Sequence, residues 1–164
     1  MSLGGRVLRV LFLGEIVVAI SAYVLIFGLL LTDVVMREFG LGSIFGAQRI
    51  SVYLMIVCGF LGLGLAASQG RHLRPRFLDG VIPASLSAAA DRVGSVIMMG
   101  VFAAFGVIAI QFLLDAIEYG ELARTIRIPM WTIQIVVPYA FFSTALRYAI
   151  FALDPSLRPK EALE

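Results

Sequence analysis

The chain has 164 residues, of which 60% are apolar and 15% charged, and its formal net charge is +2. Soluble domains carry about a quarter charged residues, so this composition and a mean hydropathy of +0.98 exclude that class. One cysteine and one histidine exclude an intrachain disulfide, a two-histidine haem and a multi-histidine zinc site, and no catalytic constellation is present, so an enzyme is not expected.

Four runs with almost no charge are long enough to cross a bilayer. A hydrocarbon core of about 30 Å needs about 20 apolar residues in a helix, because only helices and closed barrels satisfy every backbone group in lipid. The runs are apolar on all sides, whereas barrel strands alternate over about 10 residues. The sequence therefore predicts an all-α integral membrane bundle in one domain, residues 1–164. Transmembrane helices are expected at about 10–36, 50–69, 92–115 and 130–153.

The first run contains the acidic residue closest to a membrane interior, Glu15. Arg6 and Arg9 precede the run as in a secretory signal, but its apolar length favours a retained helix. Acids inside membranes are functional candidates by default. We interpret Glu15 as an interfacial carboxylate near Arg9 or the arginines of the inner loop, with a proton-coupled carboxylate as the alternative. No second buried charge is expected.

Small residues mark the second and third runs. Gly62/Ala66 and Gly100/Ala104 are four residues apart, a spacing that lets helices approach closely in lipid, and we expect both pairs to form packing faces. A short interfacial helix is expected at Ser43 to Arg49, within a glycine-rich outer loop, and a second one at Ser85 to Arg92. Asp115, Glu118 and Glu121 recur every third residue after the third run, as in a helical extension.

The fourth run contains Pro138, which cannot donate to the carbonyl of Gln134, so a kink is expected there. Trp131 and Tyr148 stand near its two limits, where aromatic belts occur.

Lysine and arginine are distributed unevenly over the predicted loops. Nine lie at the two termini and in the loop between the second and third runs, and four lie in the other two loops. Positive residues stay on the cytoplasmic side, so both termini are predicted to be cytoplasmic. Scattered arginines give no nucleic-acid patch, and His72 in Arg71-His72-Leu-Arg74 is interpreted as a solvated or headgroup residue.

Several motifs along nearly the whole chain carry a family resemblance. They are Arg37 in Asp33-Val-Val-Met-Arg-Glu-Phe, then Gly46-Ala47-Gln48-Arg49-Ile50-Ser51, Phe60-Leu61-Gly62, Gly70-Arg71-His72-Leu73, and Ile128-Pro129-Met130-Trp131 followed by Pro138. With four predicted spans, the chain resembles the small membrane subunit (DctQ-like) of tripartite ATP-independent periplasmic (TRAP) transporters. It departs from that pattern at Gln48, Arg49 and Arg76, where members often have acids, and at Val57, where they often have tryptophan.

The resemblance implies a bacterial inner-membrane subunit of a sodium-driven importer of small organic acids. A periplasmic binding protein would deliver the substrate, a large multi-helix subunit would carry the sodium and substrate sites, and this chain would brace it without a cofactor. We expect a partner-subunit or phospholipid interface and a docking site for the binding protein. The interface residues would be Arg37, Gln48, Arg49, Gly62, His72, Arg92 and Pro138, and the docking residues Glu118, Glu121 and Arg124.

A second hypothesis is a small multidrug-type exporter in which Glu15 carries the proton. It predicts that Glu15→Gln abolishes drug resistance, whereas a bracing subunit tolerates the change.

Overall fold

The computed structural model describes residues 3–69, 87–123 and 126–157, most of which are helical. Within these described ranges, four stretches are long and apolar enough to cross a bilayer, the last of them formed by α4 and α5 together. This confirms the predicted all-α bundle. The elements are α1 (Leu3–Glu38), α2 (Ala47–Ser68), α3 (Ser87–Glu118), α4 (Trp131–Gln134), α5 (Val136–Leu153) and the 3-10 helix η2 (Pro155–Leu157).

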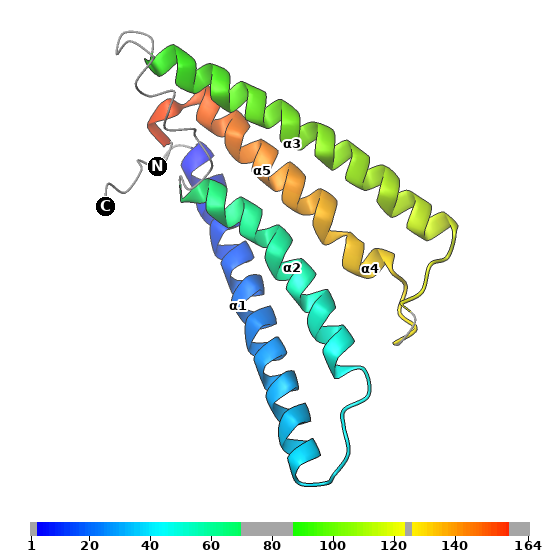
Figure 1. The fold of residues 1–164 in the computed structure, drawn as a ribbon. Coiled ribbons are helices and arrows are strands. Elements are labelled where there is room, and N and C mark those ends of the chain that lie inside the picture. The colour runs from blue at the N-terminus through cyan, green and yellow to red at the C-terminus, as the bar shows by residue number, and fades with distance from the viewer. Residues whose placement is uncertain (1–2, 70–86, 124–125, 158–164) are drawn as a thin grey trace.

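The helices form two hairpins that meet at one end of the molecule and diverge toward the other (Figure 1). In one hairpin α1 packs along α2, in the other α3 packs along α5, and contacts between α2 and α5 join the two. A Cβ added at Gly4 would lie 3.1 Å from Ile150 and 3.2 Å from Leu157, so the start of α1 lies beside the end of the described chain. We call this the terminal end, and we call the opposite end, with residues 39–46 and 119–130, the loop end.

Helices α1 and α3 stop in the same way at the loop end. Gly40 and Gly120 have φ values of +69° and +60°, a left-handed conformation that glycine adopts without strain. In each case the next residue donates its amide to a carbonyl five residues earlier, at 2.9 and 3.1 Å, which is the Schellman arrangement. The helical extension expected to include Glu121 therefore ends at Glu118.

The loop between α1 and α2 contains no separate helix. Residues 42–46 are turn and irregular structure, and α2 begins at Ala47 after Gly46, whose φ is +79°. The interfacial helix expected at Ser43 to Arg49 is therefore corrected to a turn followed by the first turn of α2. At the terminal end, helical structure from Ser87 onward continues into α3 without a break, whereas Ser85 lies outside the described residues.

The fourth membrane stretch is interrupted where proline predicts it. Pro138 has no amide hydrogen for the carbonyl of Gln134, and the α-helix breaks at Ile135, between α4 and α5. The helix is interrupted at the expected place by this one residue, which keeps helical backbone angles (φ −58°, ψ −24°).

The protein core is small and lies mostly where the two hairpins meet. Phe102 of α3 stacks on Tyr148 of α5, with ring centroids 5.8 Å apart and planes 7° apart. Tyr148 was expected in an interfacial belt, but it is buried beside Phe151 and Ala145. Its ring is drawn inward because an aromatic face is available on α3. The lone Cys58 is buried between α1 and α2.

Close helix approaches use different glycines from those expected. A Cβ added at Gly106 would lie 2.9 Å from the ring of Phe142, and one added at Gly64 would meet polar atoms of α1 and α5. Gly62 and Gly100 have nothing within 4 Å of such a Cβ. The packing faces predicted at Gly62 and Gly100 are therefore wrong for contacts within this chain.

Candidate functional site

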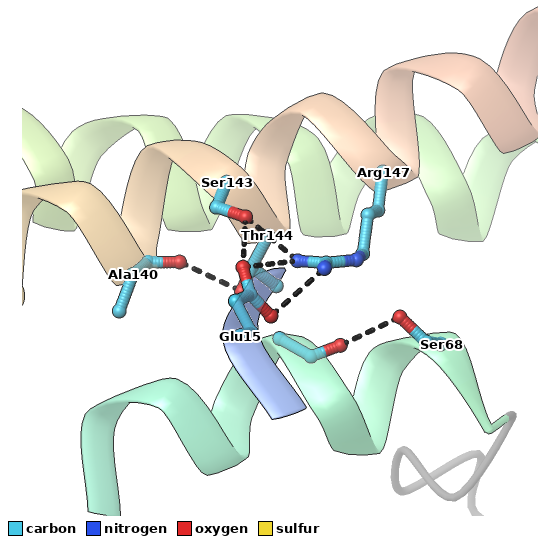
Figure 2. Close-up of polar contacts among 7 residues, drawn as sticks. Glu15, Ser68, Ala140, Ser143, Thr144 and Arg147 are labelled. Atoms are coloured by element: carbon cyan, nitrogen blue, oxygen red, sulfur yellow. Dashed lines mark hydrogen bonds and ion pairs between the residues drawn. The ribbon is translucent and has the colours of Figure 1, made fainter. Parts of the chain in front are cut away.

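A polar cluster lies inside the bundle where α1, α2 and α5 meet (Figure 2). Arg147 donates from Nη2 to Glu15 Oε2 at 2.8 Å and from Nη1 to Glu15 Oε1 at 3.1 Å. Ser143 donates to Glu15 Oε1 at 2.6 Å and accepts a hydrogen bond from Arg147 Nη1 at 2.7 Å. These three residues, with Gly64 of α2 beside them, are called the Glu15–Arg147 cluster below.

The cluster is closed to its surroundings. The side chains of Arg147 and Glu15 are 0% and 1% exposed, so each charge has the other as its chief compensation. An isolated charge in a medium of low dielectric constant is very costly, whereas a bidentate arginine–carboxylate pair offsets much of that cost. Pairing therefore explains how two ionised groups are accommodated within membrane-spanning helices.

The helix arrangement brings both partners together toward the terminal end. Glu15 lies twelve residues after the start of α1 at Leu3, and Arg147 lies six residues before the end of α5 at Leu153. At 1.5 Å per residue, these distances along the helices are about 18 Å and 9 Å. Because α1 starts and α5 ends at the terminal end, two residues 132 positions apart in sequence meet.

Residue spacing on α5 and a glycine on α2 make room for the ion pair. Ser143 and Arg147 are four residues apart and so share one face of α5. Gly64 leaves room on α2, because a Cβ there would be 2.5 Å from both Arg147 Nη1 and Glu15 Oε2. Only a residue without a side chain lets α2 cover the pair this closely.

Two neighbouring hydroxyls satisfy their own helices instead. Thr144 is fully buried and donates to the carbonyl of Ala140 at 2.8 Å, and Ser68 donates to the carbonyl of Gly64 at 2.9 Å (Figure 2). The remaining donor of the cluster, Arg147 Nε, has no hydrogen-bond partner among the described residues. The arginine is therefore held through the two terminal nitrogens of its guanidinium group.

The interpretation of Glu15 as an interfacial acid near Arg9 or the inner loop is wrong. Its partner is Arg147, and the expectation of no second buried charge is wrong for the same reason. The error came from treating Arg147 as a flanking positive charge because it lies near the end of the last apolar run. Its four-residue spacing from Ser143, at the depth of Glu15, was the available signal.

The cluster is suited to holding helices together. Both oxygens of Glu15 accept from fixed donors within the protein, whereas a proton carrier needs an open carboxylate. The described residues contain no group of three or more histidine, cysteine, aspartate or glutamate side chains placed to hold a metal ion. The geometry therefore favours a structural role over the exporter hypothesis.

The residues singled out for interfaces are spread over the molecule. Gln48 and Arg49 are exposed at the loop end, where Arg37 is half-exposed and pairs with Asp33 at 2.6 Å. Pro138 is buried by the chain's own helices, so it is not at a surface where a partner or lipid could contact it.

Other predicted residues lie apart from these. Gly62 is half-buried, and Arg92 is exposed near the terminal end of α3. Glu118 and Glu121 are exposed at the loop end. His72 and Arg124 lie outside the described residues.

Comparison with known proteins shows what the chain is similar to. Residues 26–156 match the family model of the DctQ component of tripartite ATP-independent periplasmic transporters. The ectoine TRAP transporter small permease protein TeaB of Halomonas elongata is 28% identical over 120 residues. That alignment covers 73% of this chain and 62% of the relative, so the chain spans less than two thirds of the relative's length. No solved structure matches.

The family match includes Gly64, Ser143 and Arg147 but begins after Glu15, so the acidic member of the cluster lies outside it. The match covers more than half of the chain, and the resemblance drawn from the motifs is confirmed. This multi-pass membrane protein belongs to the DctQ family, the small permease subunits of TRAP transporters.

Proposed function

We propose that the chain braces the large subunit of a sodium-coupled TRAP importer of small organic acids in a bacterial inner membrane. The large subunit carries the sodium and substrate sites, a periplasmic binding protein delivers the substrate, and both termini of this chain are cytoplasmic. In this role the chain is neither an enzyme nor a cofactor-binding protein. The relative in Halomonas elongata is named for ectoine, so a small zwitterion is a second candidate substrate class for the importer that contains this chain.

The Glu15–Arg147 cluster is the observation that carries the proposal. A subunit that moves ions needs ionisable groups that exchange partners, and transport sites are built from broken helices with accessible polar groups near mid-membrane. Here the buried acid and arginine neutralise each other, and their bonds join α1 to α5. A rigid unit without free buried charge along its described helices suits a brace.

The outer surface of α3 supports contact with a partner. Gly100 and Ala104 are both exposed, and Gly100 has nothing within 4 Å of an added Cβ. Small residues four apart let another transmembrane helix pack closely through van der Waals contact. Since this chain's own helices leave the pair uncovered, we place a helix of the large subunit there.

Reconstitution separates a brace from a transporter. The chain alone, in vesicles with an inward sodium gradient, is expected to take up no labelled dicarboxylate. The large subunit and binding protein with this chain are expected to do so, and to lose uptake when the chain is omitted. Uptake by the chain alone would contradict the proposal.

We also propose that Glu118 and Glu121, together with Arg124, help to dock the binding protein. The two acids are exposed at the loop end, which faces the periplasm in this orientation. Reversing both to lysine is expected to raise the concentration of binding protein needed for half-maximal uptake. Glu38→Lys is the matched control, because Glu38 is exposed at the loop end on the other hairpin. Equal effects of both changes would remove this role.

A further inference from the structure

A cavity of about 320 Å³ lies between the end of α1 and the start of α2, at the loop end. Its lining includes one acid and two arginines, so its formal charge is +1. It is lined by Asp33, Arg37, residues 43–47, Gln48 and Arg49. The cavity is thus a small positively charged recess at a boundary of the membrane-spanning region.

Asp33 accepts hydrogen bonds from two groups that line the cavity. Its side chain is 5% exposed, Oδ2 accepts from Arg37 Nη2 at 2.6 Å, and Oδ1 accepts from the amide of Ile44 at 2.7 Å. One buried carboxylate therefore fixes both an arginine and the loop backbone. The side chain of Arg37 remains 51% exposed, so its other guanidinium donors are available to a ligand in the cavity.

The start of α2 adds donors to the same recess. Gly46 turns the chain into the helix, and Gln48 and Arg49 in the first turn line the cavity. First-turn amides have no acceptor within their own helix, and the positive end of the helix dipole favours an anion there. Together with two arginines, these groups match the oxygens of a phosphate.

Large apolar side chains are exposed in the loop at the cavity. Phe45 lines the cavity, and Phe39 and Leu41 precede its lining in the same loop; these three largely exposed side chains are called the apolar rim. Aromatic and aliphatic side chains at a membrane boundary insert beside headgroups, while arginines reach the phosphate level. The apolar rim and the cationic recess in one loop therefore fit a lipid whose phosphate enters the recess while its chains lie along the helices.

We propose that this cavity binds the phosphate of an anionic phospholipid in the leaflet at the loop end. The inference rests on the membrane location of the chain and not on its partners, so it stands or falls separately from the bracing role. A net charge of +1 favours phosphatidylglycerol over a zwitterionic lipid. Free inorganic phosphate shares the chemistry but lacks acyl chains to contact the apolar rim.

The test measures lipid retention by the full chain purified in detergent. Native mass spectrometry during titration with phosphatidylglycerol is expected to show one lipid held more tightly than the rest. The double change Arg37→Gln/Arg49→Gln is expected to weaken its binding at least about tenfold, because hydrogen bonds to charged groups are strong. Arg127→Gln is the control, because Arg127 is another exposed arginine at the loop end.

Asp33→Asn separates a built site from general attraction. The change removes one negative charge and raises the formal charge of the cavity, so general attraction predicts tighter binding, whereas loss of the Asp33–Arg37 contact predicts weaker binding. We expect weaker binding. Stronger binding by this variant, or equal losses in the double variant and in Arg127→Gln, would overturn the proposal.

Two further arms identify the occupant. Inorganic phosphate is expected to displace the lipid only at concentrations far above that of the lipid itself, and tighter binding of free phosphate would overturn the lipid assignment. The complex with the large subunit is expected to retain the lipid. Loss of lipid from the complex, with weaker assembly of the double variant, would make the cavity a protein contact and contradict the proposal.

Discussion

Two arginine–carboxylate pairs among the described residues lie in opposite settings. Arg147 and Glu15 are 132 residues apart, lie on different helices and are buried, whereas Arg37 and Asp33 are one turn apart on α1. The first pair joins two helices at the terminal end. The second joins a helix to its following loop at the loop end.

The difference lies in what surrounds each pair. Removing one member of a buried pair leaves an uncompensated charge in a low-dielectric interior, whereas an arginine half-exposed to water keeps its hydration when its partner is lost. An arginine–carboxylate ion pair therefore stabilises the helix bundle at the terminal end and fixes the conformation of a surface loop at the loop end. Removing the arginine of each pair should therefore lower the free energy of unfolding by different amounts.

Arg147→Ala is expected to have the largest effect. It leaves Glu15 buried without its arginine, at a cost of about 3–5 kcal/mol in the free energy of unfolding. Arg37→Ala is the comparison: it leaves Asp33 without its arginine, but Asp33 still accepts from the Ile44 amide at the loop end, so we expect a smaller loss of about 1–2 kcal/mol. Denaturant unfolding in micelles measures both, and similar losses would erase the distinction between the pairs.

Gly64→Ala tests how tightly α2 covers the buried pair. The added methyl group would lie 2.5 Å from Arg147 Nη1, so the pair or α2 must move, and we expect a loss of about 2 kcal/mol. Gly62→Ala is the control two residues away, where nothing lies within 4 Å. The difference in melting temperature between the two variants reports the contact. A neutral Gly64→Ala would show that α2 does not close the cluster.

Ser143→Ala removes a hydroxyl that bonds both members of the buried pair. The ion pair itself remains, so the expected loss is smaller, about 1.5 kcal/mol. Ser68→Ala serves as the control, because Ser68 bonds only the carbonyl of Gly64 on its own helix among the contacts described. Its unfolding free energy should change by less than about 0.5 kcal/mol. Equal changes would remove Ser143 from the cluster.

Asp33→Asn is expected to have the smallest effect on stability, below about 1 kcal/mol, because its arginine is half in water. The change should instead speed hydrogen exchange of the Ile44 amide, which donates to Asp33. Glu38→Gln is the control, since Glu38 is an exposed acid nearby. Unchanged exchange at Ile44 would show that Asp33 does not order the loop.

The four spans could be predicted from sequence because charge and hydropathy mark where helices meet lipid. The interruption between α4 and α5 followed from the missing amide of Pro138. The small-residue faces did not follow, because spacing shows which residues share a face and not which face meets a neighbour. Gly62 and Gly64 are about 200° apart around the helix, and only the second faces the buried pair.

The buried pair was missed because its members are distant in sequence and one of them resembled a flanking charge. Antiparallel first and last spans bring the start of one beside the end of the other, so Glu15 and Arg147 lie at the same depth. Which helices touch is a tertiary property, set here by the contacts that α2 makes with both α1 and α5. The family motifs did not include Glu15.

The central claim is that the Glu15–Arg147 pair supports the structure of a brace and takes no part in transport. Sodium-driven uptake by the complete transporter tests it with Glu15→Gln, Arg147→Met and the double variant. Glu15→Gln leaves Arg147 buried without its acid, so the expectation that a bracing subunit tolerates this change is corrected. The single variants should lose uptake in proportion to lost assembly, and the double variant, without a buried charge, should recover both. Full assembly of the double variant with uptake still absent would contradict the account and assign Glu15 a part in transport.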